Sequence, residues 1–227
     1  MPSPSPMERW ATFDCYGTLV DWESGIAGTL GRLWPAADRE RLLRAYHRAE
    51  PLVQEAEPTT PYREVTARAL EAMAAAEGLT LDGKERDALA RSLPRWPVFP
   101  EVPGALHDIR SRRWRVGILS NTDPDLLEAS MAAIGVEPDL VVTAREAGSY
   151  KPAPGHWLVF RERSGVERDR HVHVGASLFH DVAPAAELGI PVVWINRLRE
   201  SGEVPRAAEL PDLSELPGVL DAILPAS

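Results

Sequence analysis

A regular alternation of short apolar runs with helical segments leaves few folds open to the C-terminal half of this chain. The strand-like runs lie at 115–120, 140–144, 171–176 and 191–196. Segments in which apolar residues recur every three or four positions lie at 104–113, 123–135, 155–165 and 180–189. Strands and helices that alternate at this spacing predict an α/β fold with a doubly wound parallel sheet.

The segment from 21 to 99 has a different pattern. It is rich in Ala, Leu, Arg and Glu, it has helical spacing throughout, and no strand-like run interrupts it. Four prolines between 94 and 104 indicate a linker that returns the chain to the alternating part. We therefore predict an α-helical cap domain, 21–99, inserted into an α/β core made of 7–20 and 100–227. The proline-rich residues 1–6 are predicted to form a disordered tail.

Charge and composition exclude several kinds of partner. The net charge of −9 over 227 residues argues against nucleic acid, because phosphate binding needs a basic surface. No apolar run approaches the roughly 20 residues that cross a membrane. The single cysteine, Cys15, cannot form an internal disulfide, which fits a reducing compartment. We therefore expect a cytoplasmic protein with neither a nucleic-acid nor a membrane partner.

Polar residues follow the ends of four predicted strands. In a doubly wound sheet these carboxyl ends meet at one crevice, where ligands bind. A carboxylate nucleophile there would have hydroxyl and amide donors, an ammonium group and a second carboxylate around it. Such a set suits displacement by a carboxylate and hydrolysis of the resulting ester. The residues are Asp14, Thr18, Ser120, Asn121, Lys151 and Asp181.

Lysine is rare in this chain, and only Lys84 and Lys151 occur among its 25 basic residues. Arginine serves at nearly every other position where a cation stands. A retained lysine is therefore a weak indication that a compact ammonium group is required at that place.

Four short motifs resemble the signature motifs of the haloacid dehalogenase superfamily. They are "FDCYGTLVDW", "LSNTD", "SYKPAP" and "GASLFHD", and the resemblance extends over about residues 8–200. Each motif alone is weak, but four in order on an α/β pattern are specific. The chain is most similar to the type II 2-haloacid dehalogenase branch. This resemblance implies a Rossmann-like core, a helical cap and a small carboxylate substrate, and it is compatible with a homodimer.

The resemblance also implies three catalytic residues. Asp14 would attack the substrate carbon and form an ester. Lys151 would neutralise and orient the carboxylates. Asp181 would help to activate the water that hydrolyses the ester.

Further residues would bind the substrate. Thr18 and Ser120 would position Asp14 and the substrate carboxylate, and Asn121 would help to bind the leaving halide. The branch uses an arginine early in the first cap helix to hold the substrate. Arg44 and Arg48 are both candidates, and Arg44 is the one we predict.

Two departures from the phosphatases of the superfamily point away from phosphoryl transfer. Those enzymes have an acid two residues after the nucleophile, where this chain has Tyr16, which we count among the substrate-binding residues. They also hold Mg²⁺ with an acid where this chain has Ala176. A halide leaves without a proton, so a dehalogenase can do without the first acid. We therefore predict no metal and no other cofactor, with a Mg²⁺-dependent phosphatase as the alternative.

The fourth motif also departs from the dehalogenases. Their asparagine, which orients the hydrolytic water, is replaced by Leu178. Ser177 or His180 could substitute for it. If neither does, the chain would be a catalytically weakened relative that binds a small acidic ligand or a partner protein.

Three other polar residues have ordinary structural interpretations. His171 and His173 alternate on one predicted strand, so we expect packing or surface positions rather than metal ligands. Asp123 precedes Pro124 and is expected to cap the helix that follows it.

Overall fold

A computed structural model describes residues 8–226, so the predicted tail at 1–6 lies outside the described part of the chain. Its core is a sheet of six parallel strands in the order β3-β2-β1-β4-β5-β6. The strands are β1 (Arg9–Phe13), β2 (Trp114–Ser120), β3 (Leu140–Thr143), β4 (His171–Gly175), β5 (Val192–Ile195) and β6 (Ala208–Leu210). The predicted doubly wound α/β fold is therefore confirmed.

Helices cover both faces of this sheet, and for that reason its central strands β1 and β4 are buried along their whole length. Phe13 of β1 belongs to the cluster formed with α5, α6 and α10 on one face. Trp10, on the same strand, belongs to the cluster formed with α8 and α9 on the other face. The helices of the core are α5 (Val102–Ser111), α6 (Pro124–Ile134), α7 (Ala144–Ala147), α8 (Gly155–Ser164), α9 (Ala183–Glu187) and α10 (Leu216–Ile223).

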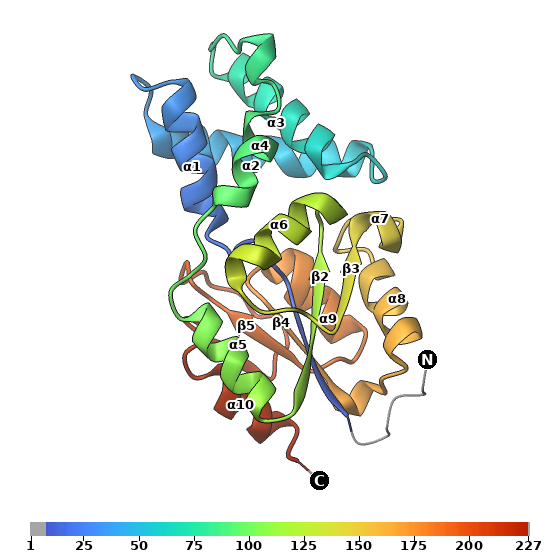
Figure 1. Cartoon of the computed structure of the whole chain (residues 1–227). Coiled ribbons are helices and arrows are strands. Elements are labelled where there is room, and N and C mark those ends of the chain that lie inside the picture. The colour runs from blue at the N-terminus through green and yellow to red at the C-terminus, as the bar shows by residue number, and fades with distance from the viewer. Residues whose placement is uncertain (1–7, 227) are drawn as a thin grey trace.

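A second group of helices lies beyond the carboxyl end of the sheet (Figure 1). It comprises α1 (Trp22–Leu33), α2 (Arg39–Ala56), α3 (Tyr62–Ala76) and α4 (Ala88–Ser92), with 3₁₀ turns at Gly83–Glu85 and Leu93–Arg95. The two connections to the core lie side by side. Val20 forms an antiparallel bridge with Val98, and the Asp21 N–H donates to the Pro97 carbonyl at 2.8 Å. We call α1–α4 the cap helices; the boundaries predicted for a separate domain stay a prediction.

Most predicted elements occur within a few residues of their expected ends, but two predicted helices are interrupted. The segment 82–93 contains a 3₁₀ turn before α4, and the Asp82 side chain accepts a hydrogen bond from the Lys84 N–H in that turn. The segment 180–189 begins as a π-helical turn, Leu178–Val182, before α9. The strand β6, the helix α10 and a 3₁₀ turn at Arg168–Arg170 were not predicted, because such short elements leave little periodicity to detect.

The expectation that Asp123 caps its own helix is wrong. Its carboxylate makes no capping bond to α6 and instead accepts hydrogen bonds from the Tyr62 and Arg63 N–H groups, at 3.0 and 2.8 Å. Pro61, the residue before α3, provides no side-chain cap. A carboxylate of the core therefore caps a cap helix, and the reason is that the fold brings the start of α3 next to the start of α6.

None of the helices in the described range 8–226 is long and apolar enough to cross a membrane.

Candidate active site

The predicted site lies where the winding of the sheet reverses direction. The chain leaves β1 toward β2 and β3, whereas it leaves β4 toward β5 and β6, and β1 and β4 are neighbours in the sheet. The connections diverge there and leave a crevice at the carboxyl ends of these two strands. Asp14 directly follows β1, and Ala176 directly follows β4. Side chains from two distant parts of the sequence therefore meet at this point.

Lys151 joins the two predicted carboxylates of the site. Its Nζ donates to Asp14 Oδ1 at 2.8 Å, to Asp181 Oδ1 at 2.7 Å and to the Leu119 carbonyl at 2.9 Å. The side chain is buried, with 1% exposed, and all three of its N–H donors are used. Lys84, in contrast, is exposed. Of the two lysines, the buried one therefore has the environment that requires a compact ammonium group.

Asp14 is held by the turn that follows β1. The Thr18 hydroxyl donates to Asp14 Oδ2 at 2.9 Å and accepts from the Ala176 N–H at 2.9 Å. Gly17 within this turn has φ +94°, a conformation that a side chain would strain, and an added Cβ would lie 3.2 Å from the Trp22 indole nitrogen. Within "DCYGT", the turn at Gly17 and the hydroxyl of Thr18 together orient the Asp14 carboxylate.

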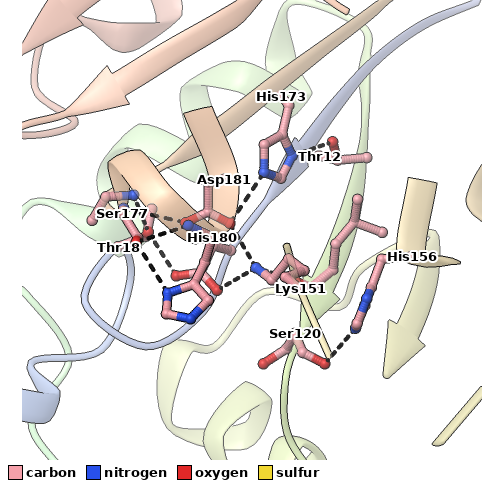
Figure 2. Close-up of polar contacts among 12 residues, drawn as sticks. Thr12, Thr18, Ser120, Lys151, His156, His173, Ser177, His180 and Asp181 are labelled. Carbon is pink, nitrogen blue, oxygen red and sulfur yellow. Dashed lines mark hydrogen bonds and ion pairs between the residues drawn. The ribbon is translucent and has the colours of Figure 1, made fainter. Parts of the chain in front are cut away.

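Asp181 is held by the π-helical turn after β4. Its Oδ2 accepts from the Ser177 N–H at 3.2 Å, and its Oδ1 lies 3.4 Å from His173 Nε2 (Figure 2). A Cβ at Gly175 would lie 2.4 Å from the Asp181 Cβ, so only glycine lets this carboxylate approach the strand end. Thr12 joins His173 at 2.9 Å and His171 at 2.7 Å, which places both histidines in buried packing positions.

The pKa values of Asp14 and Asp181 shift in opposite directions, although both carboxyl groups bond to Lys151. Burial raises the pKa of Asp14 to about 6, although Lys151 and Thr18 oppose this. Burial also disfavours the charge of Asp181, but Lys151 and His173 outweigh it and hold its pKa well below the usual value. The same two carboxylates overcome burial at Lys151 and keep the pKa of its ammonium group above the ordinary value. The geometry therefore provides one permanently charged pair beside a carboxyl group that titrates.

Ser120 and Asn121 also lie at this site, but with different surroundings. The Ser120 hydroxyl is buried and has no hydrogen-bond partner among the described residues, while its carbonyl lies 3.1 Å from His156 Nε2 (Figure 2). The Asn121 side chain bonds to both main-chain polar groups of Lys151, at 2.7 and 3.1 Å. Ser120 thus has an unused donor in the pocket, whereas Asn121 positions the lysine.

A pocket of about 600 Å³ extends from these residues toward the cap helices. The cap contributes His47, Glu50 and Gln54 from α2 and Tyr62 from α3. Trp22 stacks on His47 with ring centroids 4.8 Å apart, and both line the pocket. Sequence analysis missed the residues of α2, because helical spacing alone does not indicate which side of a cap helix faces the core.

The structure does not bring Arg44 to this pocket. Its side chain is 62% exposed and lies 3.7 Å from Glu40. Arg48 is 69% exposed and faces Glu77. Neither candidate lies among the residues that line the pocket, so the geometry gives no support to a substrate-binding arginine in α2. Tyr16 does line the pocket, although its hydroxyl faces Ser130 Oγ at 2.9 Å.

Arg197 is a pocket residue that sequence analysis did not single out. Its Nη2 donates to the Thr18 carbonyl at 2.8 Å and to Glu101 Oε1 at 2.6 Å, and its guanidinium lies 3.5 Å from the centre of the Phe99 ring. It therefore fastens the turn that carries Thr18 to the segment by which the chain returns from the cap helices. Its position two residues after the end of β5, at the same edge of the sheet as Asp14, was the available signal.

The donor set at Asp14 does not fit Mg²⁺. The ion prefers six oxygen ligands in an octahedron. Here Lys151 occupies the space between the carboxylates of Asp14 and Asp181, and Ala176 offers no side-chain oxygen. No group of three or more His, Cys, Asp or Glu side chains suited to a metal occurs within residues 8–226.

Fold and site together define an enzyme of the doubly wound α/β class, with a buried charged cluster at its topological switch point and inserted helices above it. Residues 9–189 match the family model described as haloacid dehalogenase-like hydrolase, and the chain belongs to that family. It is a hydrolase of that fold.

Sequence identity between this chain and individual relatives is modest. The chain is 28% identical over 204 residues to an (S)-2-haloacid dehalogenase of Pseudomonas sp. (strain YL), covering 85% of this chain and 86% of that one. A phosphoserine phosphatase of Thermus thermophilus is 32% identical over 140 residues, but the match covers only 60% of this chain and 55% of that protein. A crystal structure of an L-2-haloacid dehalogenase superposes with a TM-score of 0.85 at 27% identity, covering 94% and 99% of the two chains.

Proposed function

We propose that this protein is a metal-independent (S)-2-haloacid dehalogenase that uses Asp14 as its nucleophile. The observation that carries the proposal is the buried Lys151 ammonium group, bonded to both Asp14 and Asp181 beneath the pocket. Relatives named (S)- or L-2-haloacid dehalogenase, which match over most of both chains, support the substrate class. The Ser120 hydroxyl, which is unpaired among the described residues, and nearby main-chain N–H groups would receive the substrate carboxylate, and the charge of Lys151 would attract it.

The reaction would run in two steps. An Asp14 carboxylate oxygen attacks carbon 2 of the substrate, a carbon–oxygen bond forms, and the halide leaves with the electron pair of the carbon–halogen bond. Water then adds to the carbonyl carbon of the Asp14 ester, which releases a 2-hydroxy acid, restores the carboxylate and sets free one proton. The halide leaves without a proton, which agrees with Tyr16 in place of a second carboxylate, and the alkoxide expelled in the second step takes one of the two protons of the attacking water.

A phosphatase is the weaker alternative. It would need a proton donor for an alkoxide leaving group, whereas the Tyr16 hydroxyl faces Ser130 and burial holds its pKa well above the ordinary value. It would also need a cation to offset the charge of a phosphoryl group, and the donor set at Asp14 and Asp181 does not fit Mg²⁺.

We further propose that His180 receives the proton of the hydrolytic water. Asp181 has both oxygens occupied by Lys151, His173 and the Ser177 N–H. His180 lines the pocket, its Nδ1 lies 3.1 Å from Ser177 Oγ, and burial lowers its pKa, so the ring is neutral near pH 7 and can act as a base. This arrangement would replace the asparagine that Leu178 has displaced.

Replacement of His180 tests this second proposal. We expect His180→Gln to release the first equivalent of halide at the wild-type rate and then to turn over about 100-fold more slowly, because the ester accumulates. Rapid-quench measurement of halide release and mass spectrometry of the intact protein would detect the burst and the ester. An equal slowing of the first turnover would show that His180 does not act in the hydrolytic step.

The decisive experiment for the function is halide release from a panel of (S)-2-haloacids with EDTA present, for the wild type and for Asp14→Asn. We expect release that persists in EDTA and disappears in the variant. Repeated turnover in water enriched in heavy oxygen should also label Asp14, since water attacks the ester carbonyl. Absence of halide release from the wild type would favour the catalytically weakened relative, and Mg²⁺-dependent release of phosphate would favour the phosphatase.

A further inference from the structure

A carboxyl group stands opposite the reacting centre, on the cap side of the pocket. Glu50 of α2 is 5% exposed, and it lines the same cavity as Asp14 and Lys151. The Gln54 amide donates to Glu50 Oε1 at 3.1 Å, and Tyr62 also hydrogen-bonds this carboxyl. The pocket therefore has an acidic group on the cap side as well as the charged cluster on the core side.

Among residues 8–226, Glu50 has no cationic partner. The neighbouring basic residues of α2 pair with other carboxylates. His47 lies 3.1 Å from Glu23, Arg44 faces Glu40, and Arg48 faces Glu77. No ion pair between side chains of the described residues includes Glu50. A buried carboxyl group without a cation is costly, and a ligand that supplies the cation would relieve that cost.

The wall of the pocket contains further acidic side chains besides Glu50. Asp21, Glu23 and Glu200 also line the pocket, whereas Arg197, which lines it too, is already bonded to Glu101. A volume of about 600 Å³ lies within the range of pockets that hold drug-sized ligands, and a three-carbon haloacid is far smaller. The pocket thus has room for a longer substrate and an acidic wall for its distal end.

We propose that Glu50 determines substrate specificity by pairing with a protonated amino group at the distal end of the substrate. The substrate class is then a 2-haloacid with an amine-bearing side chain: its carboxylate lies at Ser120, its carbon 2 lies at Asp14, and its ammonium group lies at Glu50. This inference rests on the proposed dehalogenase function and adds the identity of the distal group.

Halide release from three six-carbon substrates tests the inference. They are (S)-6-amino-2-chlorohexanoate, its 6-hydroxy analogue and unsubstituted (S)-2-chlorohexanoate. We expect the wild type to prefer the amine over both others by about tenfold or more in kcat/KM, and Glu50→Gln to lose that preference. Glu55→Gln is the matched control, since Glu55 lies on the same helix, is exposed and does not line the pocket. Equal kcat/KM values in the wild type, or a preference that survives Glu50→Gln, would overturn the inference.

A binding measurement separates this inference from the proposed function. If no haloacid releases halide, the dehalogenase proposal fails, and calorimetry with 6-amino-2-hydroxyhexanoate and 2-hydroxyhexanoate then decides the role of Glu50. Tighter binding of the amine by the wild type, lost in Glu50→Gln and kept in Glu55→Gln, would support it. Equal affinities, or no binding of either compound, would overturn it.

Discussion

At the scale of single residues, the main finding is that identical carboxyl groups have different chemistry in different surroundings. Asp181 is surrounded by donors and keeps its charge, burial raises the pKa of Asp14 to about 6, and Glu50, which has no cationic partner among the described residues, has its pKa raised by burial to about 7. These differences follow from burial and partners rather than from residue type. Each therefore has a measurable dependence on pH.

The pH profile should report Asp14. A protonated carboxyl group is not a nucleophile, and burial raises the pKa of Asp14 to about 6, so we expect kcat/KM to fall as pH decreases through about 6. Thr18→Val removes a hydrogen bond to the charged form and should move this limb to higher pH. Steady-state kinetics between pH 4 and 9 would measure both profiles. An unchanged limb in Thr18→Val would mean that another group controls it.

Glu50 should make the stability of the protein depend on pH. Burial raises its pKa from 4.5 to about 7, so the folded state binds the proton more tightly than the unfolded state. This stabilisation is present at pH below 4.5 and is lost as pH rises through 7, by about 3 kcal/mol in all. Glutamine resembles the neutral acid and does not titrate. The free energy of unfolding of Glu50→Gln, relative to wild type, should therefore increase between pH 5 and pH 8.

Urea denaturation at several pH values would measure this difference, with Glu55→Gln as the control. If the free energies of unfolding of wild type and Glu50→Gln depend on pH in the same way, the pKa of Glu50 is not raised by folding.

At the scale of elements, the cap helices are held over the site by contacts at the start of α3. Asp123 caps this helix from the core, the Tyr150 hydroxyl donates to the Thr60 carbonyl at 2.5 Å, and Arg63 pairs with Asp125 at 2.8 Å. Since Tyr62 of the same helix lines the pocket, these contacts also position the cap side of the site.

Removal of the Asp123 carboxylate should loosen α3. We expect Asp123→Ala to weaken protection of the Tyr62 and Arg63 amides and to cost about 1 kcal/mol, as the loss of a helix cap does. Amide hydrogen exchange and thermal unfolding would measure the two effects. Asp125→Ala is the control, because its ion pair with Arg63 is exposed and contributes little. Equal effects of the two substitutions would argue against the cap.

At the scale of the whole molecule, the cap helices are connected to the core by two adjacent segments. Val20 and Val98 pair, and the Asp21 N–H bonds to the Pro97 carbonyl, so the insertion begins and ends at the same place. The six strands and their flanking helices form two clusters of buried side chains on the two faces of the sheet. The groups proposed to be catalytic lie on the core, and the group proposed to select the substrate lies on the cap helices.

This arrangement predicts the result of excising the cap helices. A chain in which a two-residue Asn-Gly turn joins Val20 to Val98 should fold with a cooperative thermal transition, because the paired ends already have hairpin geometry. It should release no halide, since the cap side of the pocket is absent. Circular dichroism and halide assays would test both expectations. A variant that does not fold would show that the core does not fold independently of residues 21–97.

Local pattern was enough to determine the doubly wound core, the inserted helices and the six polar residues at the strand ends. The reason is that apolar periodicity reports burial, and parallel strands bring their carboxyl ends to one edge. Tertiary structure alone decided which face of α2 meets the site, and so brought in Glu50 and His47 while it left Arg44 in solvent. It also decided that Asp123 caps α3 rather than its own helix. Such contacts depend on how a helix is rotated and docked, and helical spacing in a sequence does not contain that rotation.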